Sequence, residues 1–111
     1  MFIVEPTSVF LSELKSLKKK YPSIINDVDE FVQLLKEDPI RGTSLGNKCY
    51  KSRIKISSKG KGKSGGARII TYIKLLNERV YLISIYDKSE RDTLTSKEII
   101  EILKESGLLN L

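Results

Sequence analysis

The residues best suited to chemistry are four cations, Arg53, Lys55, Arg68 and Lys88, which lie in or beside the most basic part of the chain. Between residues 48 and 68 there are eight Lys or Arg residues and not one Asp or Glu. Clustered cations attract nucleic-acid phosphates, and crowding by like charges lowers the pKa of a lysine. Such a cluster can bind RNA and supply a base for cleavage by the 2′-OH group, while arginine stabilises the charge of the transition state.

The positive charge is concentrated in one third of the sequence. The chain of 111 residues carries a formal charge of +6, from 20 Lys or Arg and 14 Asp or Glu. The acid-free zone from Pro39 to Asn77 holds ten of these cations, so the rest of the chain has ten cations against fourteen acids. The length predicts a single domain over residues 1–111. A hairpin whose lysines only keep the protein in solution remains an alternative.

Several classes of chemistry are excluded by composition. The chain has no histidine and one cysteine, Cys49, so it can form neither an internal disulfide, a Cys/His zinc site nor a His-based triad. We expect no metal and no cofactor, and we interpret Cys49 as a small strand residue. No apolar run reaches the length of a membrane span and the N-terminus does not resemble a secretory signal, so we expect a cytoplasmic protein with no membrane partner.

Two strands and a loop must position the cations. Residues 50–57 alternate between apolar and charged side chains, which predicts a half-buried strand that presents Lys51, Arg53 and Lys55 on one face. A glycine-rich loop follows, and residues 67–75 form the next predicted strand. Arg68 opens that strand, where it can reach the face of Arg53. We expect Arg68 at the surface, with little effect on stability.

Further residues are candidates for RNA binding. The loop carries Lys59, Lys61 and Lys63, which join Lys51 as phosphate contacts. Tyr72 and Tyr86 offer aromatic surfaces on which bases could stack. The alternative for both tyrosines is a core position with the hydroxyl at the rim, and for Lys88 a solvated loop position.

The stretch GKGKSGG invites comparison with a phosphate-binding P-loop. That pattern requires a glycine five positions before Gly62, where this chain has Ser57. A P-loop is also followed by a helix, whereas residues 67–73 are rich in β-branched residues. Nucleotide hydrolysis is therefore not predicted.

The remaining sequence predicts an α+β fold. Helical stripes of apolar residues end at Tyr21-Pro22 and Asp38-Pro39, which predicts an antiparallel helical hairpin. Thr95 and Glu98 form a capping box for a last helix. The predicted order is β-α-α-β-β-β-α: a strand at residues 2–5, two helices, a loop at 40–48, strands at 50–57, 67–75 and 80–86, and a C-terminal helix. We expect the last three strands to pair antiparallel, with 80–86 central and the helices on one face.

The stretch ISSKGKGKSGGARIITYI, followed by VYLISIYDKSERDTLTSKEI, closely resembles the HigB/RelE-type toxins of bacterial type II toxin–antitoxin modules, within the RelE/ParE superfamily. The resemblance spans about residues 48–103. It implies a small antiparallel sheet with a helical hairpin and a C-terminal helix. It also implies metal-independent cleavage of mRNA in the ribosomal A site, with contacts to 16S rRNA, and inhibition by an antitoxin, here a HigA-like helix-turn-helix protein.

By position, the resemblance assigns the paired basic residues before the loop to Arg53 and Lys55, the arginine after it to Arg68, and the basic residue after the last strand to Lys88. Leu94 stands where some relatives have a tyrosine, so the general acid and base are not assigned. Two alternatives keep the same fold, a ParE-like gyrase inhibitor and an inactive relative that only binds its antitoxin. ParE-like chains generally lack the basic cluster, which favours the nuclease.

Overall fold

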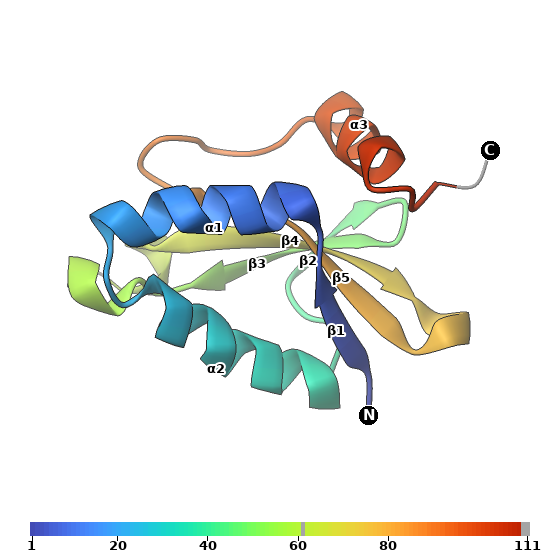
Figure 1. Cartoon of the computed structure of the whole chain (residues 1–111), viewed down its shortest axis with the longest axis horizontal. Coiled ribbons are helices and arrows are strands. Elements are labelled where there is room, and N and C mark those ends of the chain that lie inside the picture. Colours follow the sequence, from blue (N-terminus) through green and yellow to red (C-terminus); the bar gives the residue numbers. More distant parts are fainter. Residues whose placement is uncertain (61, 110–111) are drawn as a thin grey trace.

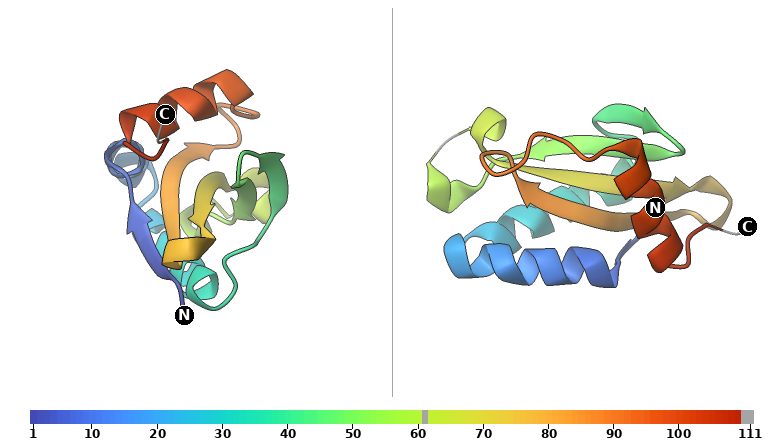
Figure 2. Two further views of the ribbon diagram at one scale, coloured as in Figure 1. Left: turned by 90° about the vertical axis from the view of Figure 1, so that its right-hand side faces the viewer. Right: turned by 90° about the horizontal axis from the view of Figure 1, so that it is seen from above.

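The protein is a five-stranded sheet with helices on both faces (Figures 1 and 2). This computed structural model describes residues 1–60 and 62–109, with Lys63 described by its backbone alone. The principal elements are β1 (Ile3–Pro6), α1 (Ser8–Lys20), α2 (Ile24–Glu37), β2 (Thr43–Gly46), β3 (Cys49–Ile54), β4 (Ala67–Lys74), β5 (Arg79–Asp87) and α3 (Ser96–Glu105). The strand order is β1-β5-β4-β3-β2, in which β1 pairs parallel with β5 and the other neighbours pair antiparallel.

The helices begin and end where local sequence signals place them. The Thr7 hydroxyl accepts a hydrogen bond from the Phe10 backbone N–H at 3.2 Å and donates one to the Leu82 carbonyl at 3.0 Å, so it caps α1 and attaches it to β5. Thr95 and Glu98 form the predicted capping box of α3. After α3, the left-handed Gly107 closes the helix with a backbone hydrogen bond to the Lys104 carbonyl.

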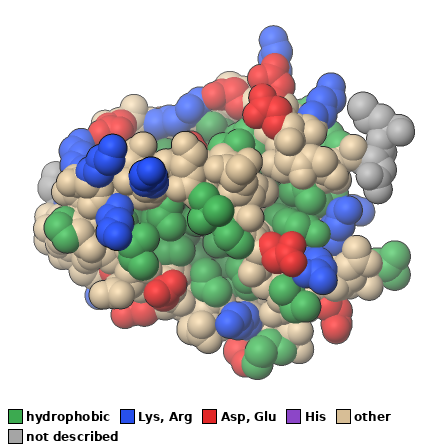
Figure 3. Space-filling view, viewed as in Figure 1, with side chains coloured by type: hydrophobic (Ala, Val, Ile, Leu, Met, Phe, Trp, Pro, Cys, Tyr) green, Lys and Arg blue, Asp and Glu red, His purple; other side chains and the backbone are tan. Residues whose placement is uncertain are grey.

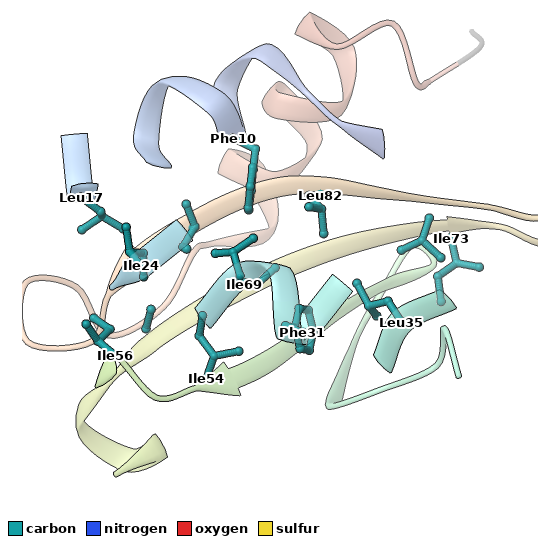
Figure 4. Close-up of a cluster of buried hydrophobic side chains, with 14 residues drawn as sticks. Phe10, Leu17, Ile24, Phe31, Leu35, Ile54, Ile56, Ile69, Ile73 and Leu82 are labelled. Atoms are coloured by element: carbon teal, nitrogen blue, oxygen red, sulfur yellow. The ribbon is translucent and has the colours of Figure 1, made fainter. Parts of the chain in front are cut away.

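The sheet is covered on both faces, which corrects the expectation that all helices share one. The apolar stripes of α1 and α2 pack on one face, where Phe10, Ile24 and Phe31 meet Ile69 (Figure 4). The other face is covered by α3, whose Leu103 packs against a second set of buried residues. That set includes Ile70, Tyr72, Ile83, Tyr86 and Leu94. Among the described residues, no helix is long and apolar enough to cross a membrane.

Two details of the sheet differ from the sequence prediction. The segment 40–48, predicted as a loop, contains the short strand β2, which turns into β3 through Asn47 and Lys48. Both turn residues have positive φ, 52° and 63°, as a two-residue hairpin of the type I′ kind requires. The central strand is β4, and β5 lies between β1 and β4. The three-stranded antiparallel unit β3-β4-β5 is as predicted.

The glycine-rich loop closes tightly against the end of β3. A Cβ atom at Gly66 would lie 2.1 Å from the Ile54 carbonyl oxygen and 2.9 Å from the Lys55 Cα atom. No real side chain tolerates such a contact with backbone atoms, so only glycine lets the chain enter β4 at this point. In the same loop, a Cβ at Gly62 would meet nothing within 4 Å.

These two glycines predict opposite outcomes for one substitution. Gly66→Ala should lower the free energy of unfolding by about 2 kcal/mol or more, because the clash is with backbone that cannot move aside. Gly62→Ala is the matched control and should leave stability within about 0.5 kcal/mol. Urea denaturation of both variants measures the difference. Equal stability of the two variants would contradict the close approach of Gly66 to β3.

Candidate nucleic-acid interface

A row of three side chains crosses the sheet on the face covered by α3. Arg53 of β3 lies directly opposite Arg68 of β4, and Arg68 lies directly opposite Tyr86 of β5. Residues opposite each other in antiparallel strands project from the same face with Cβ atoms about 5 Å apart. The sheet therefore places two arginine side chains next to each other, with a tyrosine beside the second. This confirms the placement of Arg53 and Arg68 on neighbouring strands.

An open groove of about 970 Å³ brings the four candidate catalytic residues together. Arg53, Lys55, Arg68 and Lys88 all line it, as does Lys51. Five cations, from β3 and the residue after it, from β4 and from the segment after β5, thus line one space. The groove also takes in acidic and neutral residues of α2 and of the segment after β5, namely Asp27, Glu30, Asp92 and Thr93.

Arg68 is buried rather than exposed, which corrects the sequence expectation. Only 3% of its surface is accessible. Its guanidinium donates hydrogen bonds to the backbone carbonyls of Ser64 and Ala67, both at 3.1 Å. Burial lowers the pKa of Arg68, and the neighbouring charge of Arg53 lowers it further. The contacts fix the guanidinium in place and connect it to the glycine-rich loop.

Lys88 follows β5 directly and is held by the same loop. Its backbone N–H donates to the Gly66 carbonyl at 3.0 Å, and its ammonium group pairs with the carboxylate of Asp92. The hydrogen bond and charge of Lys88 lower the pKa of Asp92, and Lys51 and Arg68 add to this effect. Asp92 is therefore an ionised carboxylate in the midst of the cations, and its side chain is 86% exposed.

Lys59 lies outside the groove and serves the structure of the loop. Its ammonium group is 2.8 Å from a carboxylate oxygen of Asp87, and this ion pair is almost fully buried. The second Asp87 oxygen accepts a hydrogen bond from the Tyr21 hydroxyl at 2.5 Å, and Ser89 donates to the first through its backbone N–H and its hydroxyl. Because this pair already occupies Lys59, the structure does not bring it to the row of Arg53 and Arg68.

Other predicted RNA contacts are distributed differently. Tyr72 is 7% exposed and packs against Tyr81, with ring centroids 6.4 Å apart, so its ring is part of the core and offers no open face to a base. Tyr86 is equally buried, but it belongs to the row beside Arg68. Lys61 and the side chain of Lys63 lie outside the described residues.

Sequence reasoning missed Arg41 as a member of the groove. Its backbone carbonyl accepts a hydrogen bond from the Ser52 hydroxyl at 3.1 Å, which attaches the segment before β2 to β3. Its buried Nε atom has no hydrogen-bond partner among the described residues, since Asp38 is 3.9 Å away. The sequence signal was the glycine that follows, Gly42. In the structure its φ is 88°, and its close approach to the Lys51 carbonyl brings the chain onto the strand.

Positive charge also gathers at the end of α1. Its last turn carries Lys18, Lys19 and Lys20, and Figure 3 shows Lys and Arg side chains clustered at the left end of the molecule, where α1 ends. The glycine-rich loop lies at this same end in Figures 1 and 2.

Within the described part of the chain, no group of three or more acidic or thiol side chains is gathered as a metal site would require.

Comparison with known proteins identifies the family. Residues 26–109 match the family model described as the RelE toxin of the RelE/RelB toxin–antitoxin system. The chain belongs to the RelE toxin family. A solved structure of E. coli toxin RelE, a double arginine-to-alanine mutant in the free state, has the same fold, with a TM-score of 0.61 and 20% sequence identity. The match covers 94% of this chain and 96% of that one.

Membership of the RelE toxin family implies an antitoxin partner and confirms the predicted α+β architecture. The matched region contains every segment that lines the groove: most of α2, the residues from 41 through β2 and β3, the start of β4, and the segment after β5. The row of Arg53, Arg68 and Tyr86 is therefore part of the toxin domain that the family model recognises.

The Asp87 cluster predicts how stability depends on pH. Burial by itself would raise the pKa of Asp87, but hydrogen bonds from Lys59, Tyr21 and Ser89 outweigh it and hold the pKa well below its ordinary value of 3.8. The ionised carboxylate therefore stabilises the folded state above about pH 4, and this contribution disappears as pH falls below that value. Asp87→Ala should lower the free energy of unfolding by about 3–5 kcal/mol at pH 7, because it leaves Lys59 without its partner.

Urea denaturation between pH 7 and pH 2 measures both effects. In Asp87→Ala the part of the acid-induced loss that belongs to this carboxylate should be absent. Glu90→Ala is the control, since it removes an exposed partner of Lys20 at 2.6 Å and should cost less than about 1 kcal/mol. The same pH dependence in wild type and Asp87→Ala would contradict the role given to the buried carboxylate.

Proposed function

We propose that this RelE-family toxin is an endoribonuclease that cleaves mRNA on the ribosome without a metal ion and thereby inhibits translation. It acts as a single domain in the cytoplasm. The observation that supports this most directly is the pair of arginine side chains, Arg53 and Arg68, next to each other across β3 and β4. Like charges placed directly opposite each other destabilise a sheet, so the pair is best explained by an anion that binds between them. A phosphate of single-stranded RNA fits this position.

The proposed reaction is transfer of the phosphate to the neighbouring ribose. The 2′-oxygen loses its proton and forms a bond to phosphorus, the bond to the 5′-oxygen breaks, and the leaving oxygen gains a proton. The products are a 2′,3′-cyclic phosphate and a 5′-hydroxyl end. Arg53 and Arg68 stabilise the charge on the non-bridging oxygens as the phosphorane forms. Lys51, Lys55 and Lys88 extend the positive field along the groove and bind the flanking phosphates.

Arg53 gives the cleanest test of this function. Its side chain is exposed, so Arg53→Ala should leave the melting temperature unchanged while the rate of mRNA cleavage on programmed ribosomes falls about 100- to 1,000-fold, as for loss of one oxyanion donor. Arg68→Ala should lose as much activity and, because the residue is 3% exposed and bonded to the loop, should also melt at a lower temperature.

Arg79→Ala is the matched control. Arg79 pairs with Glu5 at the opposite end of β5 and does not line the groove, so its loss should leave cleavage unchanged. Mapping of mRNA 5′ ends after induced expression shows whether cleavage occurs in cells. Toxicity that persists in Arg53→Ala without any new 5′ ends would support the alternative of a gyrase inhibitor. A chain without toxicity that still binds an antitoxin would be an inactive relative.

We also propose that the antitoxin is a HigA-like helix-turn-helix protein with an acidic segment that lies near the groove. The proposal is supported by the SKGKGK loop that this chain shares with HigB-like toxins and by the concentration of positive charge at residues 39–77. Co-expression of the adjacent small gene should restore growth and yield a stable complex on purification. Mixing the complex with single-stranded RNA provides the second measurement, since a blocked groove should no longer bind it. Growth inhibition that persists despite expression of the neighbour would argue against this pairing.

A further inference from the structure

The hydroxyl group of Tyr86 is buried without a hydrogen-bond partner among the residues that the structure describes. The side chain is 7% exposed, and Thr93 lies close enough to influence it without meeting hydrogen-bond geometry. Buried phenol groups normally find a partner, and an unpaired buried donor costs about 1–3 kcal/mol. A group kept in this state at the end of a basic row calls for an explanation.

The position of Tyr86 in the sheet supplies an explanation for the unpaired hydroxyl. Tyr86 lies directly opposite Arg68, and Arg68 lies opposite Arg53, so the phenol is the third member of the row. It does not line the groove itself but is buried next to Asp92 and Thr93, which do. The charges that act on it are those of Arg68, Arg91 and Asp92. Burial raises the pKa of Tyr86, and this outweighs the opposing effect of Thr93 and the two arginines, so the hydroxyl keeps its proton at neutral pH and can donate.

Two residues that act on this hydroxyl, Asp92 and Thr93, belong to the segment after β5. Thr93 and Asp92 line the groove, and Asp92 is held there by its pair with Lys88. The Asp92 side chain is 86% exposed, and exposed pairs of this kind contribute about 0–1 kcal/mol. An RNA strand brings several singly charged phosphodiesters into a groove lined by several cations, so it competes effectively for Lys88 and releases Asp92.

We propose that the hydroxyl of Tyr86 donates a hydrogen bond to the phosphate that Arg53 and Arg68 bind, once that phosphate has replaced Asp92 beside Lys88. This inference rests on the proposed function and makes Tyr86 a catalytic residue, not a stacking surface. The bond goes to a non-bridging oxygen, whose negative charge grows as the phosphorane forms. No proton is transferred from the phenol, which acts as a fixed neutral donor next to two cationic ones.

The test is Tyr86→Phe, which removes the hydroxyl and keeps the ring. Affinity is measured with a DNA trinucleotide, which carries the same phosphates but has no 2′-OH and cannot be cleaved. Binding should weaken about 10-fold, as expected for one hydrogen bond to a charged group, and mRNA cleavage on programmed ribosomes should slow about 10- to 100-fold. The melting temperature should be unchanged or slightly higher, because an unpaired buried hydroxyl has been removed.

Tyr72→Phe is the matched control, since it removes a hydroxyl from an equally buried tyrosine that lies outside the row. It should change neither trinucleotide binding nor cleavage. Wild-type binding and cleavage in Tyr86→Phe would overturn the inference and return Tyr86 to the core or to base stacking, which phenylalanine preserves.

Arg53→Ala distinguishes an error in the role of Tyr86 from an error in the proposed function. If it loses trinucleotide binding while Tyr86→Phe keeps it, the groove binds phosphate and only the role of Tyr86 is wrong. If neither variant changes binding, the groove is not a phosphate site and the proposed function fails with it.

Discussion

The arrangement of the groove depends on one buried carboxylate. Asp87 is 1% exposed and follows Tyr86 at the end of β5, where it binds Lys59, Tyr21 and Ser89. A buried charge is tolerated only when it is paired and hydrogen-bonded. Asp87 meets this condition by holding the glycine-rich loop, the residue that ends α1 and the start of the segment after β5 in one place. The loop carbonyl that receives the Arg68 guanidinium is fixed as a result.

This anchoring offsets a repulsion that the sheet itself creates. The register of β3 and β4 places Arg53 and Arg68 opposite each other, and burial together with repulsion by Arg53 lowers the pKa of Arg68. Two apolar cores, one on each face of the sheet, supply the stability that lets such a row persist. All the acids of the chain lie outside the zone from residue 39 to 77, so the carboxylates that line the groove come from α2 and from the segment after β5.

The features predictable from sequence are those that local spacing determines. The alternation at residues 50–57 correctly placed Lys51 and Arg53 on the face away from the α1–α2 core, and the capping box at Thr95 correctly marked the start of α3. Contacts between distant segments were not predictable. Lys59 meets Asp87 across 28 positions of sequence, and Arg68 is buried by a loop that its own composition marks as exposed. The face covered by α3 is set by its packing against Ile70, Ile83 and Tyr86, which local sequence patterns could not assign to a particular helix.

The position of Leu94 is consistent with the proposal that the sheet supplies the reactive groups. Some relatives have a tyrosine at this position, whereas here Leu94 is 7% exposed and packs in the core beneath α3 with Ile99 and Leu103. It therefore anchors the segment that carries Lys88 and Asp92, and it cannot offer a hydroxyl to a substrate. The phenol of the row belongs to β5, which pairs with β4 from Arg79 to Asp87 and with β1 at residues 79–82. A donor on a paired strand is held more firmly than one on a loop, which suits the role proposed for Tyr86 beside the phosphate.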